Sequence, residues 1–214
     1  MIYAVTGKGR SGTSIVMQML AAGGMPIVCD PHTLGCSFES GQAQSNAEYM
    51  AARAPGWHGQ AIKILEPQVF TPPTGHAYRF VWCRRDYMDQ ALSTIKYVMK
   101  ANDREKNYPT VAKLAKTIRK DSRRQLRRLK AYPDSKLMIV DFAKLLTEPA
   151  IQARRIADFI EQPLDVEAMA AEVIPRTTGV YTGFLAIDIM KRHDARVAAI
   201  KAESGNGQET TTAD

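Results

Sequence analysis

Short apolar runs alternate along the chain with longer stretches in which apolar residues recur at helical spacing. The short runs predict strands at residues 2–6, 25–29, 61–65, 78–83 and 136–140. The helical pattern predicts helices at 13–22, 46–54, 87–100, 110–131, 148–161, 166–173 and 187–202. Strands that alternate with helices are typical of βαβ units, so the sequence predicts an α/β fold of three layers, α/β/α, around a mainly parallel sheet.

The chain has the organisation of one domain. Its 214 residues can bury a core without a metal or a disulfide. We expect a single domain over residues 1–203 and a frayed, polar tail over 204–214. Polar segments with Gly and Pro at 30–59, 102–107 and 175–184 are the expected loops that select a substrate.

Composition excludes several classes of protein. With 45% hydrophobic and 24% charged residues the chain is an ordinary globular protein. It has no apolar run near the roughly 20 residues of a membrane span and no signal-peptide pattern, so a cytoplasmic protein is expected. Three cysteines without a CxxC pair and four scattered histidines predict no metal site. The net charge of +7 favours an anionic partner.

A glycine-rich loop, GKGRSGTS from Gly7 to Ser14, separates the first predicted strand from the first predicted helix. Such a loop points backbone N–H groups at an anion held at the helix N-terminus. Its spacing resembles the P-loop of nucleotide-binding proteins, so a P-loop-type fold is expected, but Thr13 stands where the P-loop has its lysine. Arg10 and Lys8 are the cations that remain. Because phosphoryl transfer depends on that lysine and on Mg²⁺, the loop favours an anion that needs no metal.

The segment Gly9 to Ser14 resembles the PRSGT-type loop of sulfotransferases that use 3′-phosphoadenosine 5′-phosphosulfate (PAPS). In that family the loop holds the 5′-phosphosulfate of the donor. Gly9 replaces the usual proline of the family. The resemblance implies that Arg10 also neutralises charge on the leaving oxygen, and that the loop residues that bind PAPS are Lys8, Gly9, Arg10, Ser11, Gly12, Thr13 and Ser14.

A second segment, RDYMDQALS from Arg85 to Ser93, resembles the R-[DN]-P-x-D-x-x-x-S motif that binds the donor's 3′-phosphate in the same family. Arg85 follows a predicted strand and Ser93 lies about two helical turns further on, so both can reach one phosphate. Tyr87 replaces the family's proline. Residues 140–149 and 154–160 resemble the family's YEDLL-x-[DE]-P strand and the RIAxFL helix that follows it.

The catalytic base is not defined by these motifs. Where the cytosolic branch of the family has Lys-Thr-His, this chain has Lys63, which would approach the sulfuryl group, and Leu65, which cannot accept a proton. Glu39 is the favoured base, because its surroundings resemble an acidic segment of some bacterial and carbohydrate sulfotransferases. Glu66 and His58 are the alternatives, although strand alternation would point Glu66 away from the side of Leu65.

Together the motifs imply a PAPS-dependent sulfotransferase that moves a sulfuryl group to a hydroxyl or amine of a small-molecule or carbohydrate acceptor, without a metal. Two alternatives stay open. In a P-loop kinase or hydrolase, Asp141 would bind Mg²⁺ after the strand at 136–140; a non-enzymatic adaptor would instead bind a polyanion.

The predicted helix from Thr110 to Ala131 carries nine Lys and Arg residues, opposed only by Asp121. It is either a surface that captures an acidic acceptor or a solvated helix face. Nucleic acid is not the expected partner, because no aromatic residues interleave with these charges.

Overall fold

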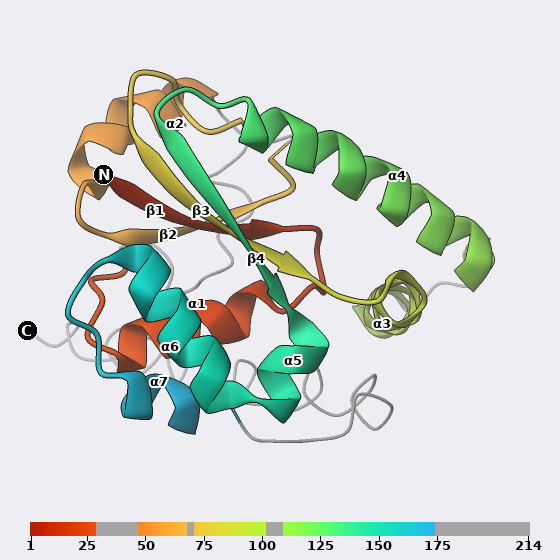
Figure 1. Ribbon diagram of the computed structural model, residues 1–214. Coiled ribbons are helices and arrows are strands. Elements are labelled where there is room, and N and C mark those ends of the chain that lie inside the picture. Colours follow the sequence, from red (N-terminus) through yellow and green to blue (C-terminus); the bar gives the residue numbers. More distant parts are fainter. Residues whose placement is uncertain (29–46, 68–70, 102–108, 174–214) are drawn as a thin grey trace, which may run out of the picture.

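The computed structural model describes residues 1–28, 47–67, 71–101 and 109–173. Within them lies a sheet of four parallel strands, β1 (Ile2–Gly7), β2 (Ala61–Leu65), β3 (Tyr78–Arg84) and β4 (Ser135–Asp141). The strand order is β2-β1-β3-β4 (Figure 1). The prediction of an α/β fold with a mainly parallel sheet is confirmed.

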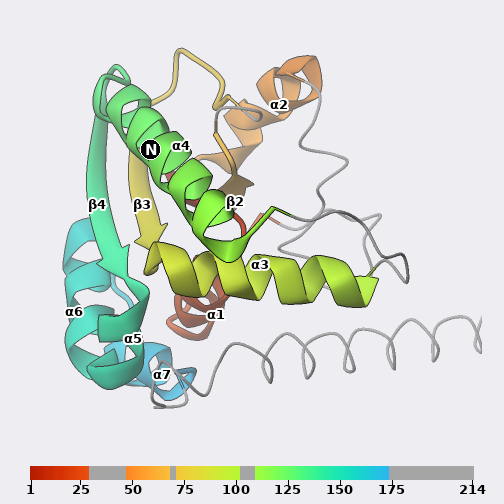
Figure 2. The ribbon, with the colours of Figure 1, turned by 90° about the vertical axis from the view of Figure 1, so that its right-hand side faces the viewer.

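The two faces of the sheet contribute to two separate cores, because side chains alternate along each strand. Tyr3 and Val5 of β1 pack with α1 (Thr13–Ala22), α5 (Phe142–Thr147), α6 (Pro149–Ile160) and α7 (Val166–Ala171). Ile2 and Ala4 pack on the opposite face with α2 (Ala47–Arg53), the 3₁₀ turn η2 (Ala54–Trp57) and the end of α4 (Val111–Lys130). These are the three layers that the pattern predicts (Figures 1 and 2).

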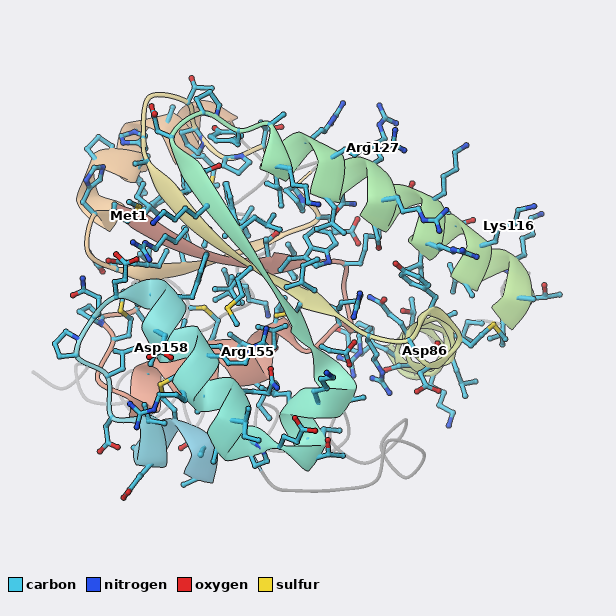
Figure 3. The ribbon with its side chains drawn as sticks, viewed as in Figure 1. Met1, Asp86, Lys116, Arg127, Arg155 and Asp158 are labelled. Atoms are coloured by element: carbon cyan, nitrogen blue, oxygen red, sulfur yellow. The ribbon has the colours of Figure 1, made fainter. Side chains whose placement is uncertain are left out.

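Helix α3 (Tyr87–Ala101) lies beyond the carboxyl ends of the strands and packs against α4 (Figure 2). Ala91 of α3 is buried together with Ala115 and Ile118 of α4. Helix α4 is amphipathic, since Ile118 and Leu129 are buried while the basic residues of the helix are exposed. Figure 3 shows Lys116 and Arg127 extending away from the sheet.

Two local predictions were wrong. Residues 25–28 form a single parallel bridge, Ile27 to Ala61, instead of a strand, because Pro26 has no N–H with which to extend the ladder. Residues 142–147, expected as part of a strand segment, form helix α5, whose first turn is capped by Asp141 Oδ1 at 3.0 Å from Ala143 N. The helix expected over 46–54 is confirmed as α2, and η2 follows it from Ala54 with proline in its first turn.

No helix in the described part of the chain is long and apolar enough to cross a membrane. The predicted helix at 187–202, the tail at 204–214 and the loops at 102–107 and 175–184 lie outside the described residues, as does most of the segment 30–59.

Candidate functional site

The register of the sheet brings three loops to one edge. Gly7, the last residue of β1, pairs with Leu65 of β2 on one side and with Cys83 of β3 on the other. The loop after β1 therefore lies between Glu66, which follows β2, and Arg85, which follows β3. Ligands of open α/β sheets bind at this edge, at the carboxyl ends of the strands.

The loop after β1 needs two of its glycines for close packing. A Cβ on Gly12 would lie 2.5 Å from Cδ2 of Phe142, and the residue has a φ of 100°, which favours glycine. A Cβ on Gly7 would lie 2.6 Å from Oγ of Ser11. Helix α1 then begins with no side-chain cap from the described residues and no acidic residue in its first turn. Its first N–H groups are oriented to bind an anion.

Arg10 adopts a left-handed conformation with a φ of 67° and extends to α3. Its Nε donates to Oγ of Ser93 at 3.3 Å, and its guanidinium lies 5.0 Å from the ring centre of Tyr97. The structure thus brings together two predicted donor-binding residues that are 83 positions apart. Arg10 reaches the same residue that the motif assigns to the 3′-phosphate, so one anion can contact both.

Gln90 positions the loop, a role that sequence reasoning missed. Its side chain is 2% exposed, and its Nε2 donates to the carbonyl of Gly9 at 2.7 Å and to that of Lys8 at 3.3 Å. It thereby fixes the backbone immediately before the strained Arg10. The available signal was its place in the Arg85–Ser93 segment, three residues before Ser93, which puts both on one face of the helix.

Arg85 is buried with unused hydrogen-bond donors. The residue is 8% exposed, and no described residue accepts a hydrogen bond from its Nε or Nη2. Its guanidinium lies 4.8 Å from the ring centre of Phe142, the same ring that packs on Gly12. Burial lowers the pKa of Arg85; Asp89 opposes this shift and Arg10 adds to it. A buried cation with open donors is costly unless an anion binds it.

Two hydroxyl residues of the loop are also buried. No described residue forms a hydrogen bond with Oγ of Ser11, which is 2% exposed. Thr13, the residue in place of the P-loop lysine, is 4% exposed at the start of α1. The orphaned donors of Ser11 and Arg85 fit the oxygens of a phosphate or a phosphosulfate.

Lys63 reaches the loop from the middle of β2. It pairs in register with Val5, so its side chain projects to the face covered by α1. There its Nζ donates to Oγ of Ser14 at 3.1 Å, in the first turn of α1, although the residue is only 3% exposed. The structure therefore places both predicted residues, Lys63 and Ser14, at the same helix terminus.

Lys8 is engaged by carboxylates. Its Nζ lies 3.1 Å from Oε2 of Glu66 and 3.5 Å from Oδ2 of Asp121 in α4. Glu66 has a φ of 48° and lies beyond the end of β2, so the expected strand alternation does not apply to it. Lys8 and Glu66 thus form an ion pair with each other, so the charge of Lys8 is already partly neutralised.

Another candidate base, His58, is not at this edge. His58 bonds to His76 at 3.0 Å and lies beside the amine of Met1, at the amino end of β1. The loop is at the opposite end of this strand, roughly 20 Å away for six residues. Glu39 lies outside the described residues.

Both carboxylate oxygens of Asp141 accept hydrogen bonds within the fold. Its Oδ2 accepts from Nε and Nη2 of Arg84 at 3.2 and 2.9 Å, and its Oδ1 caps α5. This arrangement follows from the register, which pairs Arg84 with Asp141. Among the described residues there is no group of three His, Cys, Asp or Glu side chains placed to hold a metal ion.

Residues 76–166, less than half of the chain, match the family model described as the sulfotransferase family. The matched residues include β3, the Arg85–Ser93 segment and the 140–160 region, so this match confirms the predicted relationship to sulfotransferases. The loop at 7–14 lies outside the matched residues.

Comparison with solved structures found similar chains of low identity. The sulfotransferase domain of the olefin synthase from Synechococcus PCC 7002 is 15% identical, with 78% of this chain and 75% of that chain covered and a TM-score of 0.48. Sulfotransferase STF9 from Mycobacterium avium is 13% identical over 80% and 66% of the two chains, with a TM-score of 0.47. A sugar kinase from Janibacter sp. HTCC2649 is 17% identical over 75% and 95%, with a TM-score of 0.39. Comparison with curated proteins gave no match.

Proposed function

We propose that the protein is a sulfotransferase that uses PAPS as its sulfuryl donor and acts on a hydroxyl or amine of a small-molecule or carbohydrate acceptor. The observation that carries this proposal is Arg85, a buried arginine beside the glycine loop whose Nε and Nη2 have no hydrogen-bond acceptor among the described residues. An arginine in that position recognises a phosphate by charge-assisted hydrogen bonds.

In the proposed donor site, Arg85 and Ser93 bind the 3′-phosphate of PAPS. The N–H groups of residues 9–14, with the hydroxyls of Ser11, Thr13 and Ser14, bind the 5′-phosphosulfate. Arg10 lies between the two groups, since it belongs to the loop and contacts Ser93. No step of this binding requires a metal ion.

The chemical step is an in-line displacement at sulfur. The acceptor oxygen or nitrogen forms a bond to sulfur while the bond from sulfur to the bridging phosphate oxygen breaks, and a base takes the acceptor's proton. Negative charge develops on the leaving phosphate. Arg10 and Lys63 are the cations proposed to stabilise that charge, because Arg10 belongs to the loop and Nζ of Lys63 contacts Ser14 in the first turn of α1. Glu39 remains the proposed base.

A thermal-shift titration with adenosine 3′,5′-bisphosphate, run beside ADP and ATP with Mg²⁺, tests the donor site. A ligand at about 100 times its Kd stabilises the protein by about 2.7 kcal/mol. For a domain of this size, each kcal/mol raises Tm by about 2–4 °C. Stabilisation by the bisphosphate alone is expected. Stabilisation by Mg-ATP alone would reject the proposal in favour of a kinase.

A further inference from the structure

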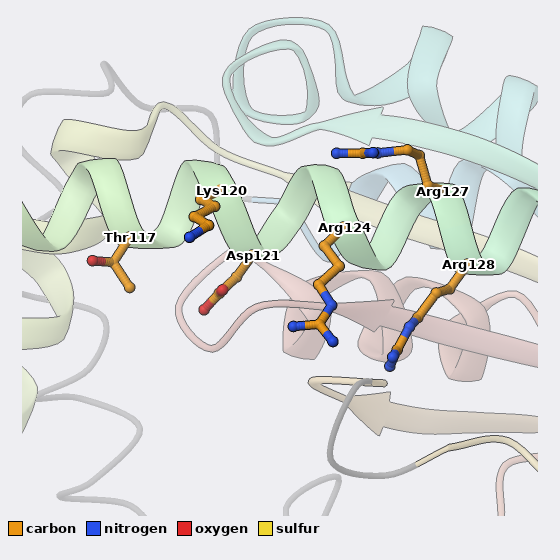
Figure 4. Close-up of a pocket in the computed structure, with 6 residues that line it drawn as sticks. All are labelled: Thr117, Lys120, Asp121, Arg124, Arg127 and Arg128. Carbon is orange, nitrogen blue, oxygen red and sulfur yellow. The ribbon is translucent and has the colours of Figure 1, made fainter.

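A groove of about 620 Å³ runs along one helix, α4, next to the proposed donor site. In the close-up of Figure 4, Lys120, Asp121, Arg124 and Arg128 extend from the same side of α4, whereas Arg127 leaves from the other side. The groove is lined by Thr117, Lys120, Asp121, Arg124, Arg127 and Arg128.

Asp121 connects this groove to the glycine loop. Its Oδ2 lies 3.5 Å from Nζ of Lys8, the second residue of the loop. Lys8 in turn contacts Glu66 after β2. The groove therefore begins where the loop and the carboxyl end of β2 meet, and a molecule that reaches the proposed sulfuryl position from this side passes over α4.

The groove is strongly cationic. Four of its six residues are basic, and its one carboxylate, Asp121, is shared with Lys8. Within the described part of the chain, no carboxylate lies within ion-pair distance of Lys120, Arg124 or Arg128. No described carboxylate therefore competes with a ligand for these three side chains.

The spacing of the three cations disfavours the helix, although Arg128 lies in its last turn, where a cation is favourable. Lys120, Arg124 and Arg128 follow one another at four-residue spacing, and like charges at this spacing destabilise a helix. A helix face that is merely solvated usually alternates the signs of its charges. The three side chains extend over about 12 Å of the helix. The planar guanidinium groups of the two arginines can each form two hydrogen bonds to a carboxylate, sulfate or phosphate.

We propose that this groove binds a negatively charged group of the acceptor, so that the preferred acceptor carries a carboxylate, sulfate or phosphate in addition to the group that receives the sulfuryl. The proposal rests on the proposed function and narrows its substrate class. The anionic group lies over Lys120, Arg124 and Arg128, while the accepting hydroxyl or amine reaches toward the loop.

The test uses acceptor pairs that differ only in one anionic group. The pairs are a 4-nitrophenyl glucuronide with its glucoside, galactose 6-sulfate with galactose, and glucose 6-phosphate with glucose. Sulfuryl transfer to each compound is assayed with PAPS, and binding of each compound is measured in the presence of adenosine 3′,5′-bisphosphate. The variant is the double change Arg124→Gln and Arg128→Gln. Its control is Arg119→Gln with Arg123→Gln, which removes the same charge from exposed positions of α4 outside the groove.

We expect at least one anionic acceptor to have a kcat/KM about 10- to 100-fold above that of its neutral counterpart. The groove variant should lose this difference, mainly through a higher KM for the anionic acceptor, and the control variant should keep it. Equal use of both members of every pair would overturn the proposal, and so would failure to bind any anionic member at 150 mM salt (about physiological). Tight, salt-dependent binding of RNA or DNA that the groove variant abolishes would also overturn it, in favour of a nucleic-acid surface.

Binding of adenosine 3′,5′-bisphosphate is measured separately for all three proteins. If this nucleotide binds each of them while acceptor preference fails, only the groove proposal is wrong. If it binds none of them, the proposed function itself is wrong.

Discussion

Arg10 donates a hydrogen bond from Nε to Oγ of Ser93 and thereby joins the loop after β1 to helix α3. The two residues come from separate sequence motifs, one expected to bind the 5′ side of the donor and the other its 3′-phosphate. Their contact indicates that the two halves of the proposed site form one continuous anion-binding surface. Binding of one phosphate should therefore depend on residues assigned to the other.

Replacing Arg85 by alanine is expected to weaken binding of adenosine 3′,5′-bisphosphate by about 10- to 100-fold, because charge-assisted bonds to the 3′-phosphate are lost. Binding of AMP, which has a 3′-hydroxyl, should change much less. The unliganded variant should keep its stability or gain some, since an unpaired buried cation has been removed. Calorimetric titration and thermal unfolding measure these effects.

The neighbouring Arg84 provides the control for that experiment. It is exposed and pairs with Asp141, so Arg84→Ala should leave nucleotide affinity unchanged and cost at most about 1 kcal/mol of stability. Equal losses for the bisphosphate and AMP in Arg85→Ala would mean that Arg85 does not recognise the 3′-phosphate.

Gly12→Ala is expected to destabilise the protein by more than Gly24→Ala. Both glycines have positive φ, at 100° and 89°, and alanine costs about 1–2 kcal/mol in that conformation. A Cβ on Gly24 meets nothing within 4 Å, whereas one on Gly12 would overlap Phe142. Denaturant unfolding of both variants isolates this overlap, and equal destabilisation would show that Phe142 moves aside at no cost.

Gln90→Leu is expected to lower the affinity for adenosine 3′,5′-bisphosphate and to cost about 1–3 kcal/mol of stability, because the carbonyls of Lys8 and Gly9 lose their donor. Thr94→Val is the matched control on α3, since its hydroxyl donates to the carbonyl of Gln90 in the same helix and, among the described residues, not to the loop. A positioning role predicts a loss of nucleotide affinity in Gln90→Leu alone. If both variants bind the nucleotide like the unmodified protein, Gln90 serves stability only.

Lys63→Met is expected to reduce kcat for sulfuryl transfer by about 100-fold or more while nucleotide affinity falls less, because the proposed role of Lys63 is to stabilise charge that develops during transfer. Lys63→Arg should restore part of the rate. Single-turnover assays with radiolabelled PAPS and nucleotide titrations separate the two effects. A variant that loses affinity and rate in the same proportion would indicate that Lys63 only binds the donor.

Cys83 predicts a pH dependence of stability. Burial raises the pKa of its thiol from 9.0 to about 12, although nearby Lys63 acts in the opposite direction. The unfolded chain therefore releases this proton at a lower pH than the folded protein does, and stability falls as the pH rises above 9. Between pH 8 and 10.5, the unfolding free energy of Cys83→Ala should decline less steeply than that of the unmodified protein. Parallel declines would place the thiol in contact with water.

The sequence alone determined much of the first βα unit and of the donor motifs. An apolar run, a glycine loop and helical spacing predicted β1 and α1 within a residue of their ends, because the information is local. Arg85 and Ser93 were proposed from the resemblance of residues 85–93 to a sulfotransferase motif, which is also a local pattern, and their role stays a prediction. The exception was α5, where the cap by Asp141 begins a helix that the apolar pattern did not indicate.

Tertiary structure alone decided which of these residues act together. Lys8 meets Glu66 and Asp121, Gln90 holds the backbone of Gly9, and Arg10 reaches Ser93. Each contact joins residues 58 or more positions apart. Such contacts depend on strand order and register, which bring the ends of β1, β2 and β3 to one edge. A local pattern of residues carries no information on that register. Only the folded chain shows that Lys8 pairs with carboxylates, whereas two donor atoms of Arg85 meet no acceptor among the residues that the structure describes.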